Sequence, residues 1–166
     1  MARRARAPLD STLVDDLAVV AAQLGRPPRA FRRVAVRCPY GAPAVVEQKP
    51  FDRDGAPFPT QYWLTCRHLC QAIARIEAAG GVERWSRAAA ADPGLAASLE
   101  QAHARQRALR PDLPGGIGGA TRGGSLKCLH AHAAFALAQP GYELGDRILA
   151  EAEPLWPPGG CCTALG

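Results

Sequence analysis

The chain has 166 residues, of which 48% are hydrophobic, and it carries a formal net charge of +5. This length and composition suit one globular domain with its own core and exclude a disordered chain. No apolar run approaches the ~20 residues of a membrane span, and Asp15 and Asp16 interrupt the first apolar stretch too early for a signal peptide. We therefore predict a cytoplasmic protein that does not enter a membrane.

The N-terminal segment, residues 1–30, is predicted to be Arg-rich and helical. Leu13, Leu17 and Val20 recur at helical spacing and predict a helix over residues 10–24. Residues 1–37 contain eight Arg against three Asp, whereas the rest of the chain balances 12 basic with 12 acidic residues. Such a segment can attract an acidic protein partner or RNA. No aromatic side chains interleave with the arginines as stacking platforms, which weighs against nucleic acid.

Residues 31–162 are predicted to form a single α+β domain, in which a small antiparallel sheet of about three strands packs against several helices. Alternating apolar residues predict a strand at 31–37, and residues 44–48 are predicted to form a second strand, joined to the first by the turn Cys38–Gly41. Residues 60–65 are β-branched and aromatic and predict a third strand. Between the second and third strands, residues 50–59 contain three Pro and predict a loop.

The second half of this domain is predicted to be helical. We expect helices at 66–79, 82–91, 94–109, 126–138 and 143–153, with Asp92 and Pro93 separating the second and third. Residues 111–124 are rich in Gly and Pro but match no phosphate-binding fingerprint, so they predict a hinge or surface loop. Large side chains are few, and the expected core anchors are Phe58, Trp63, Trp85 and Phe135.

The six cysteines are the chain's clearest chemical signal. In the cytoplasm, cysteines are more often thiols or metal ligands than disulfides. Cys38, Cys66 and Cys128 lie at predicted turns or helix starts, and a tetrahedral zinc site needs four Cys or His ligands. His130 can converge with Cys128 only if the helix predicted at 126–138 begins later, after Cys128. The alternative is that the thiols are small buried hydrophobes.

The same residues also suit thiol chemistry. Cys66 and Cys128 are predicted in the first turn of a helix, where the helix dipole favours the thiolate. A cysteine nucleophile needs a histidine base nearby, and the sequence offers His68, His130 and His132. Glu77 is either a surface residue, a partner of a nearby arginine, or an acid.

Several short motifs occur in order along residues 31–162: Arg37–Gly41, Asp54–Gly55, Pro57–Thr60, Tyr62–Cys66, Gly116–Gly119 and Lys127–His130. In combination they resemble the bacterial family catalogued as domain of unknown function 501. The resemblance implies a small cytoplasmic bacterial protein and carries no activity with it. It marks Cys38, Cys66, Cys128 and His130 as the characteristic thiol and imidazole positions, with Cys161 or Cys162 as substitutes.

Three hypotheses follow. The first is a metal-binding domain, with zinc held by Cys38, Cys66, Cys128 and His130, that serves as a structural or interaction module; an iron–sulfur cluster is a minor variant. The second is a thiol enzyme or redox protein in which Cys66 or Cys128 is the nucleophile and His130 the base. The third is a metal-free module that binds a protein or RNA partner through its Arg-rich N-terminus.

Overall fold

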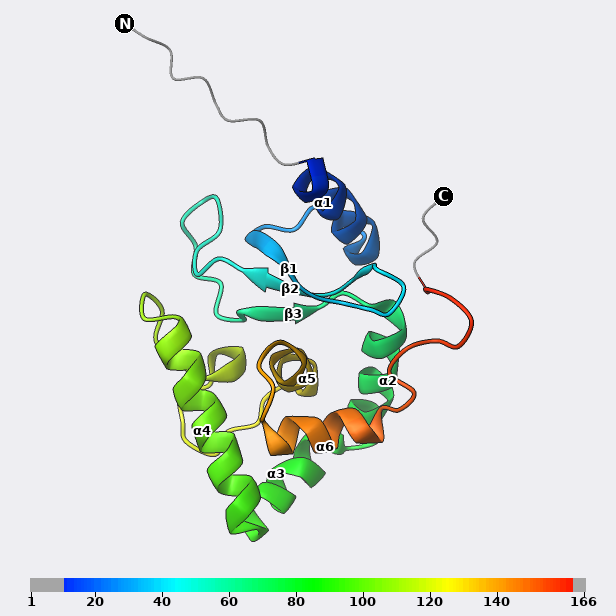
Figure 1. The fold of residues 1–166 in the computed structure, drawn as a ribbon. Coiled ribbons are helices and arrows are strands. Elements are labelled where there is room, and N and C mark those ends of the chain that lie inside the picture. Colours follow the sequence, from blue (N-terminus) through cyan, green and yellow to red (C-terminus); the bar gives the residue numbers. More distant parts are fainter. Residues whose placement is uncertain (1–10, 163–166) are drawn as a thin grey trace, which may run out of the picture.

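A three-stranded antiparallel sheet forms one layer of the protein, and helices form the rest (Figure 1). The computed structural model describes residues 11–162, with side chains from residue 15 onward. The strands are β1 (Phe31–Arg37), β2 (Pro43–Gln48) and β3 (Tyr62–Leu64), in that order across the sheet. Val46 of β2 pairs with Val34 on one side and with Trp63 on the other. The predicted α+β class and small antiparallel sheet are confirmed.

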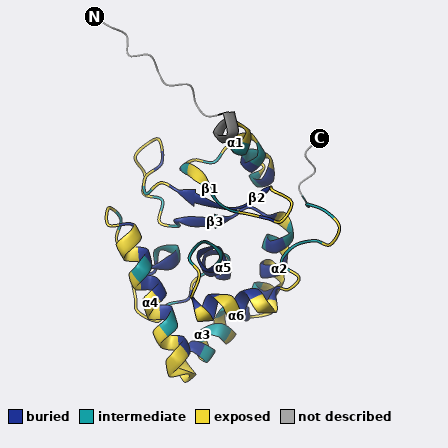
Figure 2. Ribbon diagram, viewed as in Figure 1, coloured by how far each residue is buried: buried dark blue, intermediate teal, exposed yellow. Residues whose placement is uncertain are grey.

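The central strand β2 is buried at every position (Figure 2). Helix α1 (Ser11–Leu24) lies above the sheet in Figure 1, and helix α5 (Leu129–Ala138) lies below it. Gln23 of α1 donates a hydrogen bond of 2.8 Å to the carbonyl oxygen of Pro43, at the start of β2. Burial of both faces explains why β2 begins with four apolar residues in a row, Pro43–Val46, rather than with an alternating pattern.

Helix α5 lies at the centre of the molecule. It contacts all three strands, β3 most extensively, and also α2 (Arg67–Ala78), the short 3₁₀ turn at Ile117–Gly119, and α6 (Glu143–Glu151). Its sequence is apolar on nearly every side, as a helix surrounded by protein requires. Helix α3 (Gly81–Ala91) packs against α2 and α4 (Pro93–Leu109), and α4 also packs against α6.

The core is built around different aromatic residues than the sequence suggests. Of the expected anchors, Phe135 is only 1% exposed, whereas Phe58, Trp63 and Trp85 are half-buried. Tyr142, which is 2% exposed, takes the place of an anchor: its ring meets Phe135 edge-on at 5.9 Å. A buried tyrosine needs a partner for its hydroxyl group, and that partner is His132, at 2.7 Å.

Several arginines of the basic N-terminal region form ion pairs within the domain. Arg33 lies 2.6 Å from the buried carboxylate of Glu47 on the neighbouring strand. Similar pairs join Arg29 to Asp52 and Arg37 to Asp16. The first three arginines of the chain lie outside the described residues, so binding of a partner through the N-terminus stays a prediction.

Among the helices of the described part of the chain, none has the length and apolar character that crossing a bilayer requires.

Candidate metal centre

The site begins where helix α5 starts. The helix begins at Leu129, three residues later than the sequence predicts, because Cys128 has an extended backbone with φ −148° and ψ 119°. A carboxylate oxygen of Glu77, at the end of α2, accepts a hydrogen bond of 2.7 Å from the backbone N–H of Leu129. The first N–H groups of a helix lack partners within it, so Glu77 caps α5 from a neighbouring helix. This late start brings Cys128 and His130 together.

Three ligand atoms converge at this helix start. One atom each from Glu77, Cys128 and His130 lies within 4.8 Å of the other two, and all three residues are half-buried. The Oε1 atom of Glu77 lies 3.2 Å from Nδ1 of His130. Among the described residues, no other group of three or more His, Cys, Asp or Glu side chains comes this close together.

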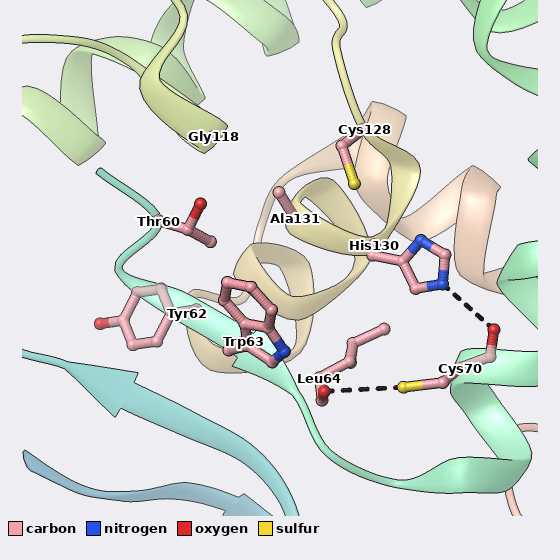
Figure 3. A pocket seen from close by; sticks show the side chains of 9 residues that line it. All are labelled: Thr60, Tyr62, Trp63, Leu64, Cys70, Gly118, Cys128, His130 and Ala131. Carbon is pink, nitrogen blue, oxygen red and sulfur yellow. Dashed lines mark hydrogen bonds between the residues drawn. The ribbon is translucent and has the colours of Figure 1, made fainter. Parts of the chain in front are cut away.

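The imidazole of His130 is held at both nitrogens. Its Nε2 atom lies 3.1 Å from the carbonyl oxygen of Cys70, while Nδ1 faces Glu77 and lies on the side of Cys128 (Figure 3). The hydrogen bond with Cys128 raises the pKa of His130 to about 9, helped by the Glu77 carboxylate and the Cys70 carbonyl and opposed by burial. In the absence of a metal ion, the ring is therefore protonated at neutral pH.

A cavity of about 340 Å³ opens beside these side chains (Figure 3). Strand β3, the 3₁₀ turn and the start of α5 supply its walls, which are mainly apolar. The residues that line it are Thr60, Tyr62, Trp63, Leu64, Cys70, Gly118, Cys128, His130 and Ala131. Trp63 is half-buried because its ring forms a wall of this cavity rather than filling the core.

Cys70 lines the same cavity but is turned to another partner. Its thiol lies 3.6 Å from the carbonyl oxygen of Leu64 in β3, which accepts a hydrogen bond from it. Burial raises the pKa of the Cys70 thiol to about 11, and the nearby Cys162 thiol adds to the effect. A thiol of this kind stays protonated at neutral pH.

Cys38 and Cys66, the other two predicted ligands, lie beside the C-terminal tail. The sulfur of Cys38 is 3.9 Å from that of Cys161, and the sulfur of Cys66 is 3.7 Å from that of Cys162. Burial raises the pKa of Cys66 to about 12, which works against this residue as a nucleophile. Of the four predicted ligands, the structure thus brings Cys128 and His130 to one point.

His132, which sequence spacing places on one helix face with Cys128, points into the core. Its Nδ1 atom lies 2.7 Å from the hydroxyl oxygen of Tyr142. Burial lowers the pKa of His132 to about 3, and the neighbouring His103 contributes to this shift. The ring is neutral and supports packing rather than the site.

Glu77 is the member of the site that sequence reasoning left undecided. The residue was considered as an acid, but a nearby arginine or solvent was its expected partner. Its partners are instead Leu129 and His130, 52 and 53 positions further along the chain. One signal could have identified it. In the last turn of α2, Glu77 directly follows Ile76, which is buried, so the carboxylate lies at the edge of the apolar face of the helix.

The loop rich in glycine contributes one wall of the cavity rather than an anion site. The N–H of Gly116 donates to the carbonyl of Ala120 at 2.7 Å, and the N–H of Ile117 donates to Nδ1 of His103 at 3.0 Å. These amides are thus used within the fold, which agrees with the structural interpretation of the loop.

Comparison with protein-family models matches residues 34–115 to the family described as "Protein of unknown function (DUF501)". The matched region contains Cys38, Cys66 and Glu77 and ends before Cys128. No curated protein and no solved structure matches the chain. The match confirms, over residues 34–115, the resemblance to this family of unknown function that the sequence motifs indicate.

Proposed function

We propose that the protein binds a transition-metal ion, with zinc as the best fit, through Glu77, Cys128 and His130. The observation that carries the proposal is the convergence of a carboxylate, a thiol and an imidazole within 4.8 Å at one helix start. Zinc binds all three of these ligand types in proteins. The proposal includes a location in the bacterial cytoplasm, where reduced thiols are available to bind metal.

The spacing of the ligand atoms fits a tetrahedral ion. Oxygen and nitrogen ligands lie about 2.0–2.1 Å from zinc, so two of them around one tetrahedral ion are about 3.3 Å apart. The corresponding atoms of Glu77 and His130 are 3.2 Å apart. Small rotations of the Cys128 side chain bring its sulfur to a similar distance, because all three atoms already lie within 4.8 Å.

The surrounding hydrogen bonds also resemble those of a metal site. A histidine that ligates a metal usually donates its other ring N–H to a carbonyl or carboxylate, which fixes the ring and its tautomer. Nε2 of His130 has such a partner in the Cys70 carbonyl oxygen, at 3.1 Å. The N–H of Leu129 orients the Glu77 carboxylate in the same way, at 2.7 Å.

Three protein ligands leave a fourth coordination position. Cys128 and His130 line the cavity, so this position faces it. A zinc ion with one exchangeable position lowers the pKa of a bound water and can polarise a substrate carbonyl or phosphoryl group. The apolar walls formed by Trp63, Leu64 and Ala131 suit a substrate with an apolar group next to the bond that is hydrolysed.

A thiol enzyme that uses Cys128 as nucleophile is the second candidate, and the contact between Cys128 and His130 favours it. In a nucleophile–histidine–acid relay, however, the nucleophile and the acid lie at opposite ring nitrogens. Here Glu77 and Cys128 lie on the Nδ1 side of His130, and a backbone carbonyl holds Nε2. This arrangement suits three ligands around one ion better than a relay.

Metal content of the full chain tests the proposal. The protein is purified under nitrogen with a thiol reductant, loaded with zinc, desalted, and analysed by elemental mass spectrometry. We expect Cys128→Ser and Glu77→Gln each to lower the zinc content by about one equivalent relative to the parent protein. Cys70→Ser is the matched control, because it removes a thiol from the same cavity that bonds to Leu64 instead.

Two results would overturn the proposal. One is an unchanged zinc content in both Cys128→Ser and Glu77→Gln. The other is a Cys128 thiol that iodoacetamide alkylates equally fast with and without zinc, since a bound ion protects its thiolate ligand. Fast alkylation of Cys128 alone, in a protein that takes up no zinc at this centre, would support the thiol enzyme.

A further inference from the structure

A second group of thiols lies at the end of the sheet, away from the Glu77 centre. Cys38 follows β1 directly, and Cys66 precedes α2. Each faces one of the two adjacent cysteines of the tail, with sulfur–sulfur distances of 3.9 Å for Cys38–Cys161 and 3.7 Å for Cys66–Cys162. In Figure 1 the tail passes beside α2 to reach this place. Residues from three distant parts of the chain thus supply four sulfurs.

These distances exclude a disulfide within either pair and are compatible with two thiolates on one zinc ion. A disulfide has its sulfurs about 2.05 Å apart. Thiolates bound to one tetrahedral zinc at about 2.3 Å have their sulfurs about 3.8 Å apart. The observed 3.7 and 3.9 Å lie on either side of the zinc value, and neither pair is joined by a disulfide.

The backbone on either side brings Cys38 and Cys66 to the same end of β2. The N–H of Cys38 donates to the carbonyl of Ala42 at 2.9 Å, and the N–H of Cys66 donates to that of Ala44 at 3.4 Å. Cys38 and Cys66 are 7% and 3% exposed, so water reaches their thiols poorly.

The tail is held over this end of the sheet by contacts that do not involve sulfur. The hydroxyl group of Tyr40 donates a hydrogen bond of 2.6 Å to the carbonyl oxygen of Pro157. Nε2 of His68 lies 2.8 Å from the carbonyl oxygen of Pro154. Leu155 and Trp156 pack against the hydrophobic core. These contacts place Cys161 next to Cys38 and Cys162 next to Cys66.

We propose that Cys38, Cys66, Cys161 and Cys162 bind a zinc ion of their own, which fastens the tail to the sheet. Four thiolates fill a tetrahedral shell and leave no exchangeable position, so this ion is structural. In the described residues the four sulfurs form two contacts rather than one closed shell. Zinc binding therefore requires the two pairs to move together, because no three of the four sulfurs lie within 4.8 Å of one another.

The test counts zinc in the full chain and in matched variants. The parent protein, reduced and loaded with zinc, is expected to hold two zinc equivalents, one for this site and one for the Glu77 centre. The double variant Cys161→Ser/Cys162→Ser is expected to lose one equivalent, and Cys70→Ser to lose none. Circular dichroism checks that each variant keeps the helical content of the parent, and a chain ending at residue 160 provides a second way to remove both tail thiols.

Cobalt substitution separates this site from the Glu77 centre. Thiolate-to-cobalt charge-transfer absorption grows with the number of sulfur ligands, so a four-sulfur site dominates that band. We expect the double tail variant to lose most of the band and Cys128→Ser to lose only a small part. A parent with one zinc that survives Cys128→Ser but not the tail variant would support this site and overturn the Glu77 centre.

The proposal fails if the double tail variant and the shortened chain bind as much zinc as the parent protein. It also fails if the metal-free parent, treated with glutathione disulfide, forms the disulfides Cys38–Cys161 and Cys66–Cys162 while the reduced protein takes up no zinc that depends on these residues. That outcome would show instead that reversible disulfides, and not a zinc ion, attach the tail to the sheet.

Discussion

At the scale of single residues, the glycine loop is fixed by one buried histidine. The N–H of Ile117 donates to Nδ1 of His103, so the ring proton is on Nε2, which donates to the carbonyl of Ser125 at 3.0 Å. The loop backbone approaches the ring so closely that a Cβ atom at Gly116 would lie 2.2 Å from Nδ1. The φ angle of Gly116 is −84°, which any residue can adopt. A glycine is therefore needed at this position for lack of space and not for its backbone conformation.

Gly116→Ala is therefore expected to destabilise the protein by about 1–3 kcal/mol, the usual cost of forcing an extra methyl group into a packed site. Urea unfolding followed by circular dichroism measures the change. Gly123→Ala is the control, because the new Cβ would lie 3.5 Å from a carboxylate oxygen of Glu100, an ordinary contact. Equal stability of the two variants would show that the loop relaxes without cost.

Residue chemistry was also the part of the site that the sequence predicted best. Cys128 and His130 were predicted as ligands from residue type and from their place near a helix start, and the structure brings these two side chains together. Glu77 was not, because its role depends on a contact 52 positions away in the chain. Spacing along one helix cannot report such a contact, and carboxylates in a last turn are usually on the surface.

At the scale of elements, helix starts decide where functional groups point. Helix α4 shows the ordinary case: Asp92 accepts hydrogen bonds from the N–H groups of Gly94, at 2.8 Å, and Leu95, at 3.3 Å, and Pro93 occupies the first turn. These local signals are why the boundary of α4 was predicted correctly to one residue. Helix α5 is capped by a carboxylate from another helix, so its start was predicted three residues too early.

Asp92→Ala is expected to lower the free energy of unfolding by about 1 kcal/mol, because two N–H groups at the start of α4 lose their acceptor. Asp92→Asn keeps the side-chain oxygen and should retain most of the stability. Thermal and urea unfolding of both variants provide the measurement. If the two variants are equally destabilised, the carboxylate charge rather than the cap is what α4 requires.

At the scale of the whole molecule, two neutral histidines lie in the core. The rings of His103 and His132 meet edge-on at 5.8 Å. Burial lowers the pKa of both, that of His132 to about 3. In the unfolded chain each has a pKa near 6.5. Below that pH the two histidines bind protons in the unfolded chain but not in the folded core, so acid favours unfolding.

Stability of the metal-free protein is therefore expected to decrease as the pH falls below about 6.5, by up to about 1.4 kcal/mol per pH unit for each buried histidine. His130 acts in the opposite sense: its raised pKa stabilises the fold below about 6.5, and this contribution is lost as the pH rises through about 9. Urea unfolding with chelator from pH 5 to 9 should show a maximum near 6.5. His132→Leu should flatten the acid side, and an unchanged slope would contradict the assignment.

The whole-molecule arrangement is also where sequence reasoning reached its limit. Periodicity and turn residues identified the sheet and its surrounding helices, because those signals are local. The division of the six thiols between the cavity and the tail was not predictable, since Cys38 and Cys161 are 123 positions apart and Cys66 and Cys162 are 96 apart. Nothing in local spacing reports which distant segments fold back onto the sheet.

The contact between Cys38 and Cys161 also implies a delay during synthesis, between the appearance of the first cysteine and that of its partner. The sheet and its two cysteines, Cys38 and Cys66, are synthesised before the segment that carries their sulfur partners. At roughly 5–20 residues per second, the 123 positions between Cys38 and Cys161 take about 6–25 s to translate. Throughout that interval the sulfur of Cys38 lacks the contact that Cys161 later provides.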